Sequence, residues 1–340
     1  MAQQHLEPTD PTARAVTGDA LAGYLRAQAT EFLRALRLHR ETGAASAAQE
    51  SVDAARALRR SARRISGSLH TFRPLLDADW SEEIRPELAW LSGTLGLEHA
   101  YEARLERLLL ALHRLSGSTS LPSQATSEAP QDRGNLTVGA AKAGALLDRQ
   151  LTLARTRAHS TALQALGSAR FHAVADKVAV LASEVPLTPA APGTDLRPPA
   201  AAAEERLTDA VAALPLVTAG HPYNAEALVH GLSPDPAPHP QDGPWHQVRL
   251  LLRLHRYARE VLCGQGAPVD VRLLAAGQAL NRHRDASEAA AAAASAARTP
   301  RIAPATAYAL GVLHADQRHE VEAARFAFQQ AWQKQRVEAV

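Results

Sequence analysis

The chain has 340 residues, of which 46% are hydrophobic and only 4% aromatic, so it is long enough to bury a real core of aliphatic side chains. Its formal net charge is +2 at pH 7, with 37 Lys and Arg against 35 Asp and Glu. A single cysteine, Cys263, excludes an intramolecular disulfide, and no uncharged apolar run of about 18 residues could span a bilayer. The polar start MAQQHLEPTDPTAR lacks the charged-then-apolar pattern of a secretion leader. These features predict a globular, cytoplasmic protein.

The composition favours helices. Ala and Leu dominate long stretches of the chain, and both residue types have high helix propensity. No sustained alternation of Val, Ile and Thr is bounded by tight hairpin turns, as would be expected for strands. The sequence therefore predicts an all-α fold.

The first half of the chain contains apolar residues at helical spacing. Residues 1–17 predict a flexible polar tail, and residues 116–135, rich in Ser, Pro and Gly, predict a flexible loop. Helices are expected over about 21–43, 54–72, 81–96, 98–115, 136–166 and 168–185. A Pro-rich linker at 187–199 then separates the half 18–186 from a second half, 200–340, of a single domain spanning 18–340.

The second half has the same helical character. A short helix at 225–232 is expected inside a His-, Pro- and Gly-rich connection. Longer helices are expected over about 204–216, 245–260, 269–280, 285–297, 303–313 and 317–336.

The stretch AARALRRSARRISGSLHTF, residues 54–72, concentrates positive charge on one side of its expected helix. Steps of 100° per residue place five arginines within a wedge of about 140°, and His70 extends this face by one turn. The five are Arg56, Arg59, Arg60, Arg63 and Arg64, and the apolar residues opposite them are Leu58, Ile65, Leu69 and Phe72. Like charges at these spacings cost about 0.2–0.5 kcal/mol per pair in an isolated helix. Because no Asp or Glu lies between Asp53 and Asp77, this face is expected to meet an anion from elsewhere.

A second stretch, WHQVRLLLRLHRYARE at residues 245–260, repeats the pattern. His246, Arg249, Arg253 and Arg256 share one wedge of the expected helix. Codon bias in a high-GC genome would favour Arg, but it would not choose a helical spacing. Each basic helix lies near the start of its half, which favours a duplicated bundle whose two basic faces converge on one groove.

The two basic stretches resemble the signatures of the CHAD family, the conserved histidine α-helical domain. The first signature, roughly V-H-x-x-R-V-x-x-R-R-L-R followed by an apolar turn ending in Phe, is matched by Arg59, Arg63, Arg64, Ile65, Leu69 and Phe72. The second, roughly H-x-x-R-K-x-x-K-R-x-R-Y-x-x-E, is matched by His246, Arg249, Arg253, Arg256, Tyr257 and Glu260. Weaker matches, among them LNRHRD around His283, extend the similarity over nearly the whole chain.

This resemblance implies two pseudo-symmetric four-helix bundles with a basic central groove or channel that binds inorganic polyphosphate without catalysis. The expected polyphosphate-binding residues are Arg56, Arg59, Arg60, Arg63, Arg64, His70, His246, Arg249, Arg253, Arg256, Tyr257 and His283. A cytoplasmic protein associated with polyphosphate granules is expected, with other polyanions as further partners. The sequence indicates no protein partner or oligomeric state.

The chain departs from the family pattern at several positions. Arg56 replaces the first family histidine, Leu250 replaces a lysine, and Ser66 stands where Arg is common. His99 and Ala100 occupy the place of an Arg-Asp pair. Because Leu250 removes a donor, ligand affinity or preferred chain length is expected to differ.

Three other functions compete with this expectation. Nucleic acid is the strongest competitor, since a basic helix can follow any polyanion, but the basic faces carry only Tyr257 as a stacking aromatic. A protein-interaction scaffold with a degenerate phosphate site is the second alternative. For an enzyme we find no Gly-rich phosphate loop, nucleophile elbow or carboxylate motif. Neither a cofactor nor a metal is expected, because no H-x-x-x-H, H-E-x-x-H or cysteine pair appears on any expected helix.

For the basic face at 54–72, the plain structural alternative is a solvated surface with ion pairs. The acidic residues available on neighbouring helices are Glu82, Glu83, Glu98 and Glu102.

Overall fold

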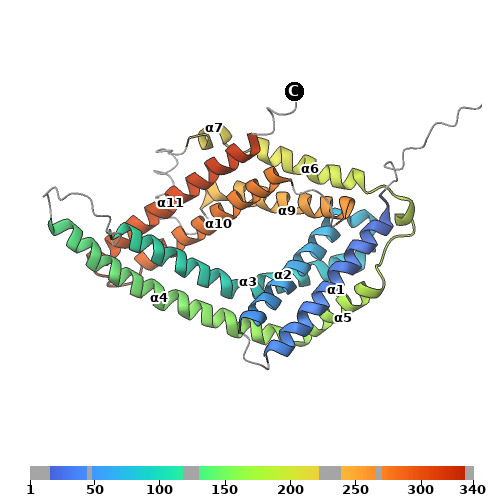
Figure 1. The fold of residues 1–340 in the computed structure, drawn as a ribbon, viewed down its shortest axis with the longest axis horizontal. Helices are drawn as coiled ribbons and strands as arrows, with labels where there is room; N and C mark the ends of the chain where they lie inside the picture. Colours follow the sequence, from blue (N-terminus) through green and yellow to red (C-terminus); the bar gives the residue numbers. More distant parts are fainter. Residues whose placement is uncertain (1–15, 44–47, 118–129, 222–238, 265–269, 334–340) are drawn as a thin grey trace, which may run out of the picture. The chain divides into compact units, whose positions relative to one another are not determined.

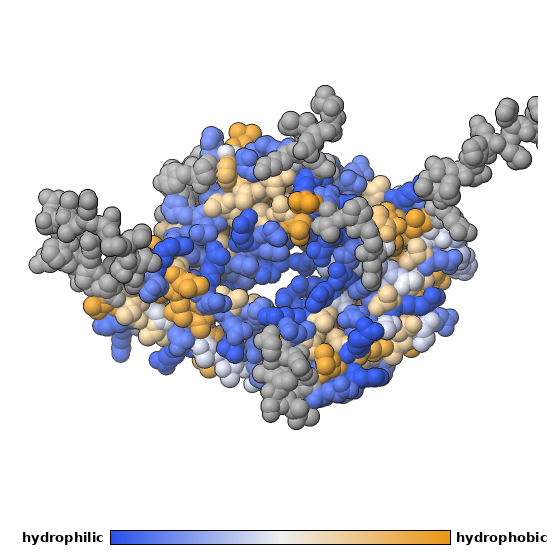
Figure 2. All heavy atoms as spheres, in the orientation of Figure 1, coloured by the Kyte–Doolittle hydropathy of each residue, from blue (hydrophilic) through white to orange (hydrophobic). Residues whose placement is uncertain are grey.

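The protein is an all-α protein, as the composition predicts (Figure 1). The computed structural model describes residues 16–43, 48–117, 130–221, 239–264 and 270–333. Within these ranges the only β-type pairing is an isolated antiparallel bridge between Leu76 and Leu187. On the face shown in Figure 2, hydrophobic residues form separate patches among hydrophilic ones, as expected for helices that bury one apolar side.

The chain folds into two compact units, each built from several chain segments. Unit 1 comprises Met1–Trp90, Ala173–Glu205 and Leu254–Ala267, and unit 2 comprises Leu91–His172, Arg206–Arg253 and Pro268–Val340. Two four-helix bundles related by pseudo-symmetry, formed by the halves 18–186 and 200–340, stay a prediction.

In unit 1, α1 (Gly18–Gly43) and α2 (Ala48–Thr71) run side by side (Figure 1). A 3₁₀ turn, η2 (Arg73–Leu75), leads into the first part of α3 (Ala78–Leu115). This unit also contains most of α5 (Ala169–Ser183), the turn η3 (Ala191–Gly193), the start of α6 (Arg197–Ala212) and the end of α9 (Gly243–Cys263). Its fully buried side chains include the predicted apolar residues Leu58, Ile65, Leu69, Phe72 and Phe171.

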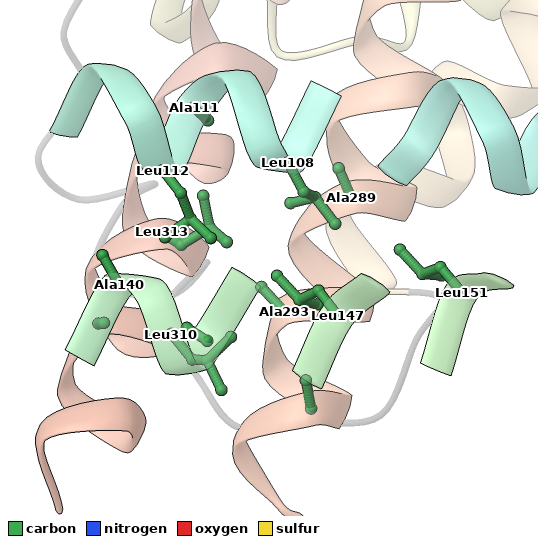
Figure 3. Packing of buried hydrophobic residues seen from close by; sticks show 13 residues of the cluster. Leu108, Ala111, Leu112, Ala140, Leu147, Leu151, Ala289, Ala293, Leu310 and Leu313 are labelled. Carbon is green, nitrogen blue, oxygen red and sulfur yellow. The ribbon is translucent and has the colours of Figure 1, made fainter. Parts of the chain in front are cut away.

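Unit 2 contains the rest of α3, α4 (Pro130–Leu166), α10 (Val271–Ala297) and α11 (Pro304–Gln333). Figure 3 shows Leu108 of α3, Leu147 of α4 and Leu310 of α11 meeting around small residues such as Ala293 of α10. Alanines let helix axes approach closely, so a core with few aromatic residues can still be densely packed. Trp245 and Phe328 anchor a second cluster, beside α7 (Leu216–Ala219), η4 (Pro240–Asp242) and the start of α9 (Gly243–Cys263).

Three predicted helix breaks are wrong. Helices α3, α10 and α11 are each continuous. The sequence predicts two helices in place of each, namely 81–96 and 98–115, 269–280 and 285–297, and 303–313 and 317–336. A single helical glycine such as Gly96 costs only about 1 kcal/mol, and polar residues between apolar runs do not stop a helix whose other side stays buried. Packing therefore outweighed the local end signals.

Three helices begin six or seven residues before their expected starts. Helix α2 begins at Ala48 rather than at residue 54, α4 begins at Pro130 rather than at 136, and α6 begins at Arg197 rather than at 204. Pro198 and Pro199 lie in the first turn of α6, where a missing N–H costs nothing. The tail at 1–15, most of the loop at 116–135 and the short helix at 225–232 lie outside the described residues.

Helix α9 approaches α2 closely at a glycine of unit 1. A Cβ atom at Gly67 would lie 2.6 Å from Cδ2 of Tyr257 and 3.2 Å from Cδ2 of Leu254. Only a residue without a side chain therefore allows Tyr257 to pack against α2.

Replacing Gly67 by alanine should destabilise the protein by about 1–3 kcal/mol, because the new methyl group overpacks the α2 and α9 contact. The matched control is Gly23→Ala in α1, because a Cβ atom at this position meets nothing within 4 Å. This variant should stabilise the helix by about 0.5–1 kcal/mol. Chemical denaturation of both variants measures the difference. Equal stability changes in the two would contradict the close contact at Gly67.

Candidate functional site

The cationic stripe of α2 is formed by the arginines opposite its buried apolar face. Leu58 and Ile65 are fully buried, whereas Arg56 and Arg60 are exposed and Arg59, Arg63 and Arg64 are half-buried. Burial of the apolar face therefore fixes which side of α2 carries the charge, as the helical spacing predicted.

Both ends of the stripe have polar neighbours in unit 1. Nη1 of Arg56 lies 3.1 Å from Oδ1 of Asp53, one turn earlier on α2. Nδ1 of His70 lies 3.2 Å from Nη2 of Arg85, on α3. These contacts orient the two side chains at the exposed ends of the stripe.

The four acidic residues considered as partners of the stripe lie close to other cations. Arg73 and Arg85 pair with Glu82, Lys177 pairs with Glu83, and Arg155 pairs with Glu98 and Glu102. These carboxylates therefore pair with cations outside α2.

An acid distant in sequence, Glu260 of α9, pairs with Arg64 of the stripe. Arg64 donates from Nε to Oε2 of Glu260 at 2.8 Å and from Nη2 to Oε1 at 3.3 Å, and the hydroxyl of Tyr24 donates to Oε2 at 2.8 Å. Burial alone would raise the pKa of Glu260, but the hydrogen bond and charge of Arg64 outweigh it and lower that pKa. Burial and then the Glu260 charge raise the pKa of Tyr24. The carboxylate thus stays ionised and joins α1, α2 and α9.

Two guanidinium groups lie near the ring of Tyr257. Arg64 of α2 and Arg256 of α9 stand over its ring, 5.9 Å and 5.3 Å from the centroid, and Nε of Arg256 is 3.4 Å from Oε1 of Glu260. The ring is 3% exposed. The structure therefore brings Arg64, Arg256 and Tyr257 together in unit 1, from two helices far apart in sequence.

The other predicted residues of α9 belong to unit 2. Arg249 donates from Nε to Oδ1 of Asn281 on α10 at 2.9 Å. His246 and Arg253 are half-buried. Burial lowers the pKa of His246, and so does the charge of Arg249.

His283 lies in the interior of unit 2 and not on a surface. Its ring is 1% exposed and stacks on Trp245 with centroids 5.7 Å apart. Burial, followed by the charge of Arg325, lowers the pKa of His283 to about 3. A neutral, enclosed ring is not positioned to contact a dissolved anion.

His283 belongs to a buried charge network around Asp242. The Asp242 carboxylate accepts from Nη1 of Arg318 at 2.8 Å, from Nη2 of Arg325 at 2.7 Å and from the hydroxyl of Ser287. Glu322 accepts from Nη1 of Arg325 at 2.7 Å. Two buried guanidinium groups thus face two carboxylates, which keeps the interior charges paired.

Sequence reasoning missed this network, although a signal was present. Arg318 and Arg325 lie at the same helical spacing as Val321 and Phe328, so they share the buried side of α11. Two arginines on an apolar stripe require buried acids. Asp242 could not be assigned as that acid, because its distance along the chain hides the contact.

A protein-family model of the CHAD domain matches residues 27–268. The chain therefore belongs to the CHAD family, as the two basic signatures predicted. It is similar to PptA from Streptomyces chartreusis, with 76% identity over 93% of this chain and 99% of that chain and a TM-score of 0.79. The CHAD domain from the plant Ricinus communis shares the fold, with 17% identity, coverage of 100% and 97%, and a TM-score of 0.52. No curated protein matches the sequence significantly.

Membrane spans and metal sites were both absent from the described part of the chain. None of its helices combines the length and the apolar character needed to cross a membrane. Among the same residues, no three His, Cys, Asp or Glu side chains gather in a way that could hold a metal ion.

The buried network predicts acid sensitivity. Below about pH 6.5 this histidine binds a proton in the unfolded chain. In the native protein His283 stays neutral until the pH falls to about 3. The unfolded state then binds more protons, so stability should fall with decreasing pH by up to about 1.4 kcal/mol per unit for this group. Denaturation at pH 7, 6 and 5 should show the loss.

The variant His283→Gln keeps an acceptor for Nε of Arg325, which donates to Nε2 of His283 at 3.3 Å, and should flatten this pH dependence. The same slope in the variant and the native chain would refute the assignment.

Replacing Asp242 by asparagine should lower the free energy of unfolding by about 3–5 kcal/mol at pH 7, since it leaves buried arginine charge unpaired.

Proposed function

We propose that the chain binds linear inorganic polyphosphate, or a similar polyanion, through the arginines of α2 and α9 without breaking a bond. The observation that carries the proposal is the cationic stripe of α2, where Arg59, Arg60 and Arg63 stand opposite a fully buried apolar face. Membership of the CHAD family supports it. A helix that accepts repulsion between like charges gains when an anion neutralises them.

Arginine suits this ligand better than lysine would. Its planar guanidinium presents five N–H donors and can bind phosphate oxygens in pairs. Glu260 uses the Nε and Nη2 edge of Arg64 and so fixes the direction of that side chain. Successive guanidinium groups along α2 would then contact successive phosphates of a chain.

The environment of Tyr257 favours polyphosphate over nucleic acid. Proteins that bind single strands stack bases on exposed aromatic rings, whereas Tyr257 is 3% exposed and already faces Arg64 and Arg256. The Tyr257 ring, which lies beside Arg64 of the stripe, is therefore not available to a base. A ligand made only of phosphates needs no such platform.

Reversing two charges of the stripe should abolish binding. Arg59→Glu with Arg63→Glu is expected to weaken polyphosphate binding at least tenfold while helix content is retained, because both side chains lie opposite the buried face. The matched control is Arg26→Glu with Arg34→Glu on α1, where both residues are exposed and the net charge changes equally. Equal weakening in both pairs would mean that only net charge matters.

Binding without catalysis has two measurable consequences. The logarithm of the association constant should fall linearly with the logarithm of salt concentration, since bound phosphates release their counterions. The length of the polyphosphate, followed on a gel, should be the same before and after long incubation with the protein. Shortening of the chain would show an enzyme instead of a binding protein.

A further inference from the structure

Helix α3 carries an exposed leucine on the side that faces away from the core of unit 2. Leu108 and Leu112 point from α3 into the packed cluster (Figure 3). At steps of 100° per residue, Leu110 lies about 180° from the midpoint between them. It is 63% exposed. Single exposed leucines are common on protein surfaces, so the residues around Leu110 decide whether this side of α3 can bind a partner.

The residues beside Leu110 carry charges of both signs and form, with it, what we call the Leu110 face. Steps of 100° place them within about 60° of Leu110 around the helix. They are Ala103, Glu106, Arg107, His113 and Arg114. Arg107 is half-buried and the others are exposed. Along the helix an acid, Glu106, precedes Leu110 by four residues, and a base, Arg114, follows it by four.

A cleft of about 400 Å³ runs beside the Leu110 face, between α3 and α11 within unit 2. Two arginines of the face reach α11 across it. Arg107 donates from Nε to Oε1 of Gln317 at 2.5 Å, and Arg114 donates from Nη2 to Oδ1 of Asp316 at 2.8 Å. The Arg114 side chain is 57% exposed, and a guanidinium has five N–H donors. Arg114 is therefore oriented by α11 and can also donate to a carboxylate that arrives from outside.

The Leu110 face is complementary to itself under a two-fold rotation. When two copies of a helix pack antiparallel about an axis through residue 110, each residue before 110 meets the residue equally far after it in the other copy. Glu106 and Arg114 lie four residues to either side of Leu110 along the helix and about 40° to either side around it. Each Glu106 therefore meets Arg114 of the partner subunit, and the two leucines meet at the axis.

We propose that the Leu110 face is the interface of a homodimer, in which α3 packs antiparallel against α3 of a second copy of this chain. A second copy is the occupant because the order acid, leucine, base matches its own reverse. A face with charges of one sign would repel its copy instead. Water leaves both leucines when they meet. One pair of helices makes a small interface, so the dimer is weak and depends on concentration. It does not depend on polyphosphate binding.

The first test is sedimentation equilibrium of the full chain over about 1–200 µM. The native chain should pass from monomer to dimer as its concentration rises. Leu110→Glu should weaken association at least about tenfold, because it brings two carboxylates together at the axis. The matched control is Leu163→Glu on α4, where the leucine is 54% exposed, and it should associate as the native chain does. A native chain that stays monomeric, or equal weakening in both variants, would overturn the interface.

Charge reversal tests which residues meet. Glu106→Arg places arginine opposite arginine in the dimer, and Arg114→Glu places acid opposite acid, so each variant alone should associate at least about tenfold more weakly. An equimolar mixture of the two variants should associate as the native chain does, since every contact between the copies again joins opposite charges. Sedimentation velocity with one variant labelled by a fluorophore detects the mixed dimer. A mixture that stays monomeric would overturn the antiparallel pairing.

A series at Glu106 keeps the proposal falsifiable if Arg114→Glu folds poorly after losing its bond with Asp316. Association should weaken from the native chain to Glu106→Gln and further to Glu106→Arg, because attraction is first removed and then replaced by repulsion. The control is Glu205→Arg on α6, where an exposed acid is reversed with the same change in net charge. It should leave association unchanged. Equal losses in Glu106→Arg and Glu205→Arg would show that only net charge matters and would overturn the interface.

Discussion

The ionised carboxylate of Glu260 is the contact on which the geometry of the α2 and α9 site depends. It accepts from Tyr24 on α1 and Arg64 on α2, and it lies near Arg256 on its own helix. The consecutive helices α1 and α2 are thereby joined at one point to α9, which is distant in sequence. Gly67 permits this approach, since any larger residue would strike Tyr257. A small residue and one acid together determine where two arginines of the candidate site point.

The protein uses arginine in two different environments. Arg318 and Arg325 are 2% and 4% exposed, and their charges are paired with Asp242 and Glu322 inside unit 2. The arginines of the α2 stripe instead lie on a face whose opposite side is buried, and their acidic partners include Asp53 and Glu260. The buried arginines stabilise the fold because their partners are internal, whereas the stripe is the surface on which the proposed binding of an external anion rests. The two environments separate arginines with a structural role from arginines that are candidates for binding a ligand.

Sequence reasoning predicted the parts of the structure that depend on local periodicity. The all-α fold follows from the composition, the buried side of α2 follows from residue spacing, and the family follows from the resemblance of the two basic stretches to its signatures. It failed at Gly96 and at Asn281, where local end signals were overruled by long packed helices, because packing energy is not visible in a short window. It also placed His283 in a groove, although contacts with Trp245 and Arg325 bury the ring. The pairings Arg64 with Glu260 and Arg318 with Asp242 connect residues far apart in sequence, so spacing alone could not reveal them.

The central claim is that a polyanion without bases is the preferred ligand. Titration calorimetry at about 0.15 M salt with long-chain polyphosphate, and with duplex DNA of equal total charge, tests it most directly. Phosphate recognition by guanidinium groups predicts clear binding heat for polyphosphate and much weaker binding for DNA. The claim would be contradicted if polyphosphate gave no detectable heat and also failed to compete for the protein. It would equally be contradicted if the DNA bound as tightly as polyphosphate.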